Sequence, residues 1–185
     1  VAAEGHLSGL LSDSDQRDPL TGALAPGAFN ALAESAFKNA RVTGAPVSLL
    51  ILTLDHFDRL TAAGGRSASD AALVETAALL EAQTSARAGS VARIDASTFA
   101  ILLPGLDRAQ ATRVASELRT ALESQSTAWK LPNLQPIPIT ASVGAAAICP
   151  SEGPTFTRAN QLFIAARRAA EAATLTGGNT VRAFQ

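Results

Sequence analysis

The spacing of apolar and polar positions along the chain predicts four strand regions. Residues 47–54 are almost continuously apolar, a pattern that predicts a strand. Residues 91–103 predict two short strands joined by a turn of small and polar residues, which is the pattern of a hairpin. Residues 139–148 alternate well enough to predict another strand, and a last strand is expected over residues 180–184.

Apolar residues spaced three or four positions apart predict helices between these strands. The first helix is expected to begin at Pro26, a residue suited to the first helical position, and to end before Gly44. Asp107 is expected to cap another helix, and a final helix is predicted over about residues 157–174. The proline-rich segment 127–138 predicts a loop.

The segment after the first strand predicts two helical pieces. A short helical turn follows Phe57, and Gly64 and Gly65 are expected to break it before a second, longer helix. Ser67 and Asp70 have the spacing of a capping box, with Asp in place of the usual Glu or Gln. The predicted order is therefore helix, strand, two helices, hairpin, helix, strand, helix, strand. Hairpin strands mixed with crossover helices favour an α/β sandwich with a central, mostly antiparallel sheet.

Composition limits the classes of function. The chain has 185 residues, is 47% hydrophobic and 17% charged, and carries a formal net charge of -1, which is typical of one globular domain. Its Lys and Arg residues are scattered, so no nucleic-acid partner is expected. No apolar stretch approaches the roughly 18 residues of a membrane span, and no secretory signal is visible, which predicts a cytoplasmic protein without direct membrane insertion.

The chain is expected to consist of a linker and one domain. Residues 1–16 are mostly small and polar, and we interpret them as a linker from a missing N-terminal module. Residues 17–185 hold all the predicted elements and form the expected domain.

Several motifs in this domain resemble those of GGDEF domains, the diguanylate cyclase family, in the same order. The resembling segments are Asp18 to Leu24 for D-x-L-T-G-L, Leu54 to Asp70 for D-x-D-x-F-K-x-I-N-D-x-x-G-H-x-x-G-D, Arg93 to Pro104 for R-Y-G-G-D-E-F-A-I-L-L-P, Thr140 to Gly144 for T-V-S-I-G, and Ala159 to Arg167 for A-D-x-A-L-Y-x-A-K. The resemblance implies the palm-like sandwich of nucleotidyl cyclases, with a central five-stranded sheet flanked by helices.

The chain departs from this family where metal ions would bind. In active members, two Asp or Glu carboxylates hold two divalent ions that activate a hydroxyl and neutralise a triphosphate. The first of these acids falls on Thr53. The signature falls on Asp95, Ala96, Ser97, Thr98 and Phe99, so both of its glycines and both of its acids are replaced. A hydroxyl ligates Mg²⁺ alongside carboxylates but brings no charge, so we expect no metal site, no cofactor and no cyclase activity.

Other family positions are altered as well. The guanine-reading Asn falls on Thr61, which leaves only Asp70 of that pair, and the phosphate-contacting Lys falls on Arg167. The product-inhibition motif R-x-x-D falls on residues 86–89, where Arg87 is out of register and the Asp is absent. No inhibitory site is therefore expected.

Two of the acidic residues have structural as well as functional interpretations. A helix cap is favoured over guanine recognition for Asp70. Asp55 matches the second Asp of D-x-D, and with His56 and Asp58 it suggests a metal cluster, but a solvated loop is favoured. Arg93 is expected to pair with a nearby acid or to cover the sheet.

These observations predict a catalytically inactive GGDEF-like domain that serves as a regulatory or protein-interaction module in a bacterial cyclic-di-GMP signalling protein. The resemblance implies a PAS or receiver domain before it, an EAL domain after it, and contact with another signalling protein. A small, polar cleft lined by Thr53, Ala96, Ser97 and Thr98 is expected to accept a protein loop. The alternative is a domain that senses GTP or cyclic-di-GMP without turning it over, for which Asp70 and Arg167 are the candidate contacts. A working cyclase with unusual metal ligands is disfavoured.

Overall fold

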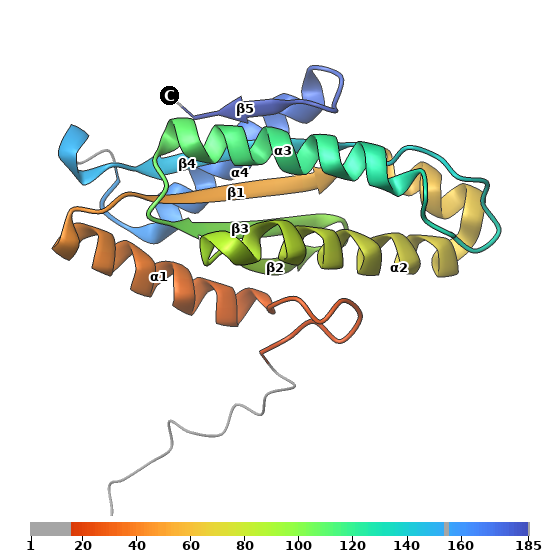
Figure 1. Ribbon diagram of the computed structural model, residues 1–185, viewed down its shortest axis with the longest axis horizontal. Coiled ribbons are helices and arrows are strands. Elements are labelled where there is room, and N and C mark those ends of the chain that lie inside the picture. Colours follow the sequence, from red (N-terminus) through yellow and green to blue (C-terminus); the bar gives the residue numbers. More distant parts are fainter. Residues whose placement is uncertain (1–15, 154–155, 185) are drawn as a thin grey trace, which may run out of the picture.

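The structure of the chain is a computed structural model that describes residues 16–153 and 156–184. Its centre is a sheet with the strand order β2-β3-β1-β4-β5 (Figure 1). The strands are β1 (Val47–Leu54), β2 (Ser90–Asp95), β3 (Thr98–Pro104), β4 (Ala141–Ile148) and β5 (Val181–Ala183). β1 is antiparallel to both β3 and β4, and only the β4–β5 pair is parallel. The predicted five-stranded, mostly antiparallel sheet is therefore confirmed, whereas the predicted linker over residues 1–16 lies outside the described residues apart from Gln16.

Helices cover both faces of this sheet. They are α1 (Pro26–Thr43), α2 (Phe57–Thr84), α3 (Arg108–Ser126) and α4 (Ala159–Leu175), with short 3₁₀ turns η2 (Ser85–Arg87) and η3 (Pro150–Glu152). One hydrophobic core joins the sheet to α2 and α3, and a second joins it to α1 and α4. In Figure 1, α2 and α3 lie in front of the sheet and α4 lies behind it. None of the helices in the described residues is long and apolar enough to cross a membrane.

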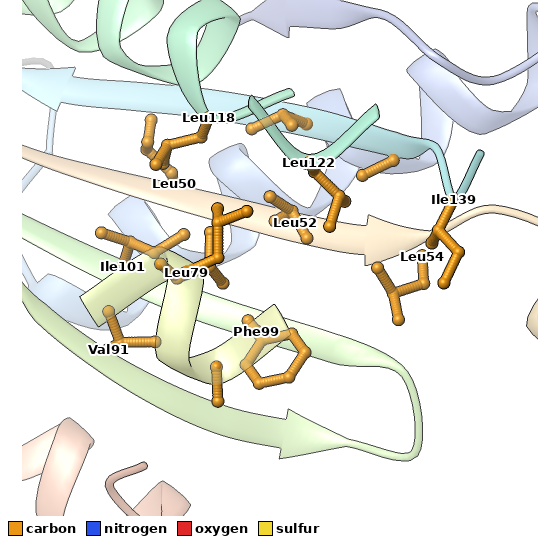
Figure 2. Close-up of a cluster of buried hydrophobic side chains, with 14 of the residues drawn as sticks. Leu50, Leu52, Leu54, Leu79, Val91, Phe99, Ile101, Leu118, Leu122 and Ile139 are labelled. Atoms are coloured by element: carbon orange, nitrogen blue, oxygen red, sulfur yellow. The ribbon is translucent and has the colours of Figure 1, made fainter. Parts of the chain in front are cut away.

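Side-chain alternation along β1 divides these two cores. Leu50 and Leu52 belong to the core under α2 and α3, and Figure 2 shows Leu118 and Leu122 of α3 directed toward them. Ile51 belongs to the opposite core, under α1 and α4. Because successive side chains of a strand point to opposite faces, Thr53 lies on the same face of the sheet as Ile51 and faces α4. This placement decides where the candidate site lies.

Local signals in the sequence set several helix ends as predicted. Pro26 occupies the first turn of α1, and Gly44 ends this helix in the left-handed conformation at φ 76°. The Asp107 side chain accepts from the Gln110 amide at 2.8 Å, and the Gln110 side chain accepts from the Asp107 amide at 2.9 Å. This reciprocal pair is a capping box, so the predicted cap at Asp107 is confirmed.

The predicted break at Gly64 and Gly65 is confirmed at Gly65, which divides α2 into two helical pieces. Gly65 alone is non-helical, at φ 75° and ψ -178°, and the helix resumes at once after it. Ser67 therefore lies inside the first turn of the helical piece that follows Gly65, beyond its capping position. The predicted cap between Ser67 and Asp70 is wrong. Asp70 pairs with Arg66 across one turn, at 3.5 Å.

Helix α4 packs unusually close to β4. A Cβ added to Gly144 would lie 2.0 Å from the Ala166 carbonyl oxygen and 2.2 Å from the Ala170 amide nitrogen. The backbones of helix and strand therefore approach each other over a residue that has no side chain. Alanines on the facing side of α4 complete this contact.

Ala88 is expected to be a strained position whose replacement by glycine stabilises the fold. It follows η2 with φ 52°, in the left-handed region that costs an L-residue about 1–2 kcal/mol. Glycine removes this cost, although its greater freedom in the unfolded chain takes back about 0.4–1 kcal/mol. Urea unfolding of Ala88→Gly should therefore give a free energy of unfolding about 0.5 kcal/mol above wild type. The matched change Ala82→Gly, at an exposed position inside α2, should lower it by about 1 kcal/mol instead. Equal losses in both variants would contradict the strain at Ala88.

Candidate functional site

The candidate site is a cavity of about 460 Å³ between α4 and the hairpin end of the sheet, here called the α4 cleft. The residues that line it are Ile51, Thr53, Ile94, Asp95, Thr98, Arg167, Ala170, Glu171, Thr174 and Leu175. Of the residues predicted to line a cleft, Thr53 and Thr98 do so, whereas Ala96 and Ser97 form the hairpin turn beside it. The sequence interpretation placed Arg167 at the family site but missed the other residues with which α4 forms a wall of the cleft. In the sequence, the one signal for these residues is Leu175, an apolar residue at the end of the helix.

The two threonines of the α4 cleft face each other on neighbouring strands. Thr53 of β1 is the register partner of Thr98 of β3, and their hydroxyl oxygens lie 3.2 Å apart, within hydrogen-bond distance. Facing Thr–Thr pairs of this kind stabilise a sheet by about 0.2–1 kcal/mol. The hydrogen bond between the two hydroxyl groups therefore links β1 to β3.

This pair does not fit the two divalent ions that the family resemblance implies. Divalent ions of the Mg²⁺ type are held by carboxylates, and neither facing side chain carries a negative charge. Asp95 lies nearby, but its Oδ1 accepts the backbone amide of Ala96 at 2.8 Å. Within residues 16–153 and 156–184, no group of three or more His, Cys, Asp or Glu side chains is placed to hold a metal ion.

Arg93 links the hairpin turn to the loop that precedes α1. Its guanidinium donates to the Ala96 carbonyl at 3.0 Å and pairs with the Asp18 carboxylate at 3.3 Å. The predicted pairing of Arg93 with a nearby acid is therefore confirmed. Asp18 also accepts from the Thr21 amide at 2.9 Å and the Thr21 hydroxyl at 2.7 Å. Burial acts to raise the pKa of Asp18, but the Thr21 hydrogen bonds and the Arg93 charge outweigh it and lower this pKa below its ordinary value.

Acid should remove the contribution of Asp18 to stability. Because the folded-state pKa of Asp18 lies below its unfolded value of about 3.9, the contribution is complete above that value and is lost as the pH falls through the folded pKa. We expect Asp18→Asn to lower the free energy of unfolding by about 1–2 kcal/mol at pH 7. Urea titrations at several pH values should show this difference shrinking below about pH 4. A difference that stays constant down to pH 2.5 would contradict the assignment.

Asp55 is half-buried in the turn after β1 and anchored by three hydrogen bonds, so the predicted solvated loop fits the exposed His56 but not Asp55. Its carboxylate accepts from the Thr140 hydroxyl at 2.8 Å, the Ser142 hydroxyl at 2.7 Å and the Asn179 amide at 2.7 Å. These bonds join the end of β1 to β4 and to the turn before β5. Local pattern could not predict them, because the partners lie 85, 87 and 124 positions away in the chain.

The remaining family positions do not converge on the α4 cleft. The Thr61 hydroxyl donates to the Phe57 carbonyl at 3.0 Å within α2, and Asp70 pairs with Arg66. Both lie on α2, which packs on the other face of the sheet from α4.

Two arginines at family positions have partners of their own. Arg167 lines the α4 cleft and pairs with Glu171 of the same helix at 3.5 Å. Arg87, which is out of register within the segment of the inhibitory motif, pairs with Glu117 of α3 at 2.8 Å.

Comparison with known proteins establishes the family. Residues 15–180 match the family described as diguanylate cyclase, GGDEF domain, and the chain belongs to this family. It is 29% identical over 170 residues to an uncharacterised 19.3 kDa protein of Streptomyces ambofaciens, covering 91% of this chain and 85% of that one. It is also 29% identical over 164 residues to the diguanylate cyclase DgcP of Pseudomonas aeruginosa, covering 86% of this chain but only 24% of that protein.

Solved structures show the same fold. The FimX GGDEF domain of Pseudomonas aeruginosa superposes with a TM-score of 0.81 at 26% identity, over 90% of this chain and 98% of that one. The GGDEF domain of DgcB from Caulobacter crescentus, solved in complex with c-di-GMP, gives 0.81 at 23% identity, over 91% and 95% of the two chains. The palm-like sandwich predicted from the motifs is confirmed.

Proposed function

We propose that this GGDEF domain does not synthesise cyclic-di-GMP and acts as a regulatory, protein-interaction module in a bacterial cyclic-di-GMP signalling protein. The observation that supports the proposal is the hydrogen bond between Thr53 and Thr98, at positions where the family resemblance places the first metal-binding acid and an acid of the signature. In-line phosphoryl transfer needs divalent ions to neutralise the triphosphate, and those ions need anionic ligands. Two neutral hydroxyls that already bond each other do not supply them.

The module part of the proposal concerns the surrounding protein. The match to DgcP covers only 24% of that cyclase, so one relative of this chain has its matching domain within a much longer protein. We also propose that the protein is cytoplasmic. We propose a PAS or receiver domain before this domain, an EAL domain after it and a further signalling protein as partner. Such neighbours would receive its regulatory effect by direct contact.

An assay of the reaction tests the proposal. The full-length protein is incubated with GTP and either Mg²⁺ or Mn²⁺, and cyclic-di-GMP is measured by chromatography beside an active diguanylate cyclase. We expect no product from this domain. Product above the protein-free baseline that is lost in Thr53→Val would overturn the proposal, since it would require chemistry at the threonine pair.

A Mn²⁺ binding experiment shows whether the domain is inactive because it lacks metal-binding side chains or for another reason. Mn²⁺ broadens NMR signals close to the ion, so amide signals of residues 53 and 98 report directly on the site. We expect no selective broadening in wild type and clear broadening in the double variant Thr53→Asp, Thr98→Glu. Broadening in wild type at micromolar Mn²⁺ would contradict the proposal.

Nucleotide sensing without turnover is a second candidate, and Arg167 is the observation in its favour. This side chain lines the α4 cleft and is about half exposed, so its guanidinium is available to a phosphate. Calorimetric titration with GTP or cyclic-di-GMP, with and without Mg²⁺, tests this candidate. Absence of heat at millimolar ligand would eliminate it.

A further inference from the structure

The α4 cleft is mainly apolar where a triphosphate-binding site would need positive charge. Ile51 forms part of its floor and is 1% exposed, and Ala170 closes the floor from the side of α4. Leu175 stands at the lip with 87% of its surface exposed. An exposed aliphatic side chain next to an apolar cavity favours an apolar occupant, because both surfaces gain from leaving water together.

The charges around the cleft favour a cation over an anion. Arg167 and Glu171 pair with each other at 3.5 Å, so their charges largely cancel. Asp95 is then the one uncompensated charge among the residues that line the cleft. Its Oδ1 is bonded to the hairpin turn, and no hydrogen bond from the described residues reaches its Oδ2. The charged residues that line the cleft therefore sum to -1, which disfavours a polyanion and favours a single positive group.

We infer that the α4 cleft binds a peptide segment of a partner protein in which an apolar side chain stands beside a lysine or arginine. The apolar side chain lies against Ile51 and Leu175, and the basic group pairs with Asp95. A cavity of about 460 Å³ has room for one or two such side chains. The inference rests on the proposed function, because a cleft that binds no metal–triphosphate complex is open to a protein segment.

NMR titration of the ¹⁵N-labelled chain with capped pentapeptides tests the inference. The probes are acetyl-Ser-Leu-Leu-Arg-Ser-amide, the same peptide with Glu in place of Arg, and the same peptide with both Leu replaced by Ser. We expect the first peptide to shift the amides of Ile94, Thr98 and Thr174 with a dissociation constant on the order of 1 mM. Each of the other two peptides should bind at least about fivefold more weakly, because one lacks the basic side chain and the other lacks the apolar side chains.

Matched variants locate the contact. Asp95→Asn keeps the acceptor for the Ala96 amide but removes the charge, and Leu175→Arg changes a side chain that packs on little else. Each variant should weaken the first peptide by about fivefold or more. Val42→Arg at the end of α1 is the control, since Val42 is an equally exposed aliphatic residue (85%) away from the cleft, and it should leave binding unchanged.

Several outcomes would overturn the inference. Two of them concern the peptides: no shift at 10 mM of the first peptide, or equal affinity of the Arg and Glu peptides. A third is that butylammonium, a cation with a short alkyl chain, binds as tightly as the first peptide. The fourth is a shift of the same amides when the protein concentration alone is raised, which would indicate that a second copy of the chain occupies the cleft. None of them affects the GTP assay. Synthesis of cyclic-di-GMP would instead defeat the proposed function, whatever the peptides do.

Discussion

Gly144→Ala is expected to destabilise the protein by at least about 3 kcal/mol, and we expect much of the variant to be unfolded at 37 °C. The added methyl group would lie 2.0 Å from the Ala166 carbonyl oxygen and 2.2 Å from the Ala170 amide nitrogen. Both neighbours are backbone atoms of a continuous helix, so α4 has to move away from β4 as a unit. The second core, which depends on α4, opens with it. Thermal unfolding followed by circular dichroism measures the effect.

The same substitution elsewhere provides the control for this prediction. Gly27 lies exposed in α1, and a Cβ there would meet nothing within 4 Å. Gly27→Ala should keep wild-type stability or raise it by about 0.5 kcal/mol, because alanine favours the helix. Similar melting temperatures for the two variants would show that α4 is not in close backbone contact with β4.

Asp55→Ala is expected to lower the free energy of unfolding by about 3 kcal/mol, since hydrogen bonds to a charged group contribute about 1.5–3 kcal/mol each and this group is half-buried. The change leaves the Thr140 hydroxyl, the Ser142 hydroxyl and the Asn179 amide without their acceptor. The turn before β5 should lose most, and hydrogen exchange at Asn179 reports on it. Urea unfolding gives the overall loss.

Two comparisons distinguish the hydrogen bonds from the charge. Asp55→Asn keeps an acceptor of the same shape, so we expect a loss of about half that of Asp55→Ala. Asp58→Ala removes an exposed acid from the first turn of α2 and should cost only about 0.5 kcal/mol. Equal losses for Asp55→Ala and Asp58→Ala would contradict the anchoring role of Asp55.

Much of the fold could be predicted because its signals are local. The apolar run of β1, the proline at the start of α1 and the reciprocal cap of Asp107 and Gln110 each involve residues within one element. The order of the motifs then predicted the five-stranded sheet, which the pattern of no single element could predict. The break at Gly65 could also be predicted, because two adjacent glycines interrupt a helical pattern locally.

The candidate site could be predicted only in part, because its contacts are long-range. The resemblance identified Thr53 and Thr98 separately, but their hydrogen bond depends on the register of β1 and β3. The anchoring of Asp55 depends on three partners from the last third of the chain. The wall of the α4 cleft depends on how closely α4 approaches the sheet, which the missing side chain of Gly144 decides.

The facing threonines also bear on how the domain withstands changes in its surroundings. Two carboxylates at these positions would repel each other whenever no cation lay between them, and the tip of the sheet would then respond to the magnesium supply of the cell. Two neutral groups that bond each other impose no such dependence. We therefore expect the hairpin to keep the same shape at low and at high magnesium concentration.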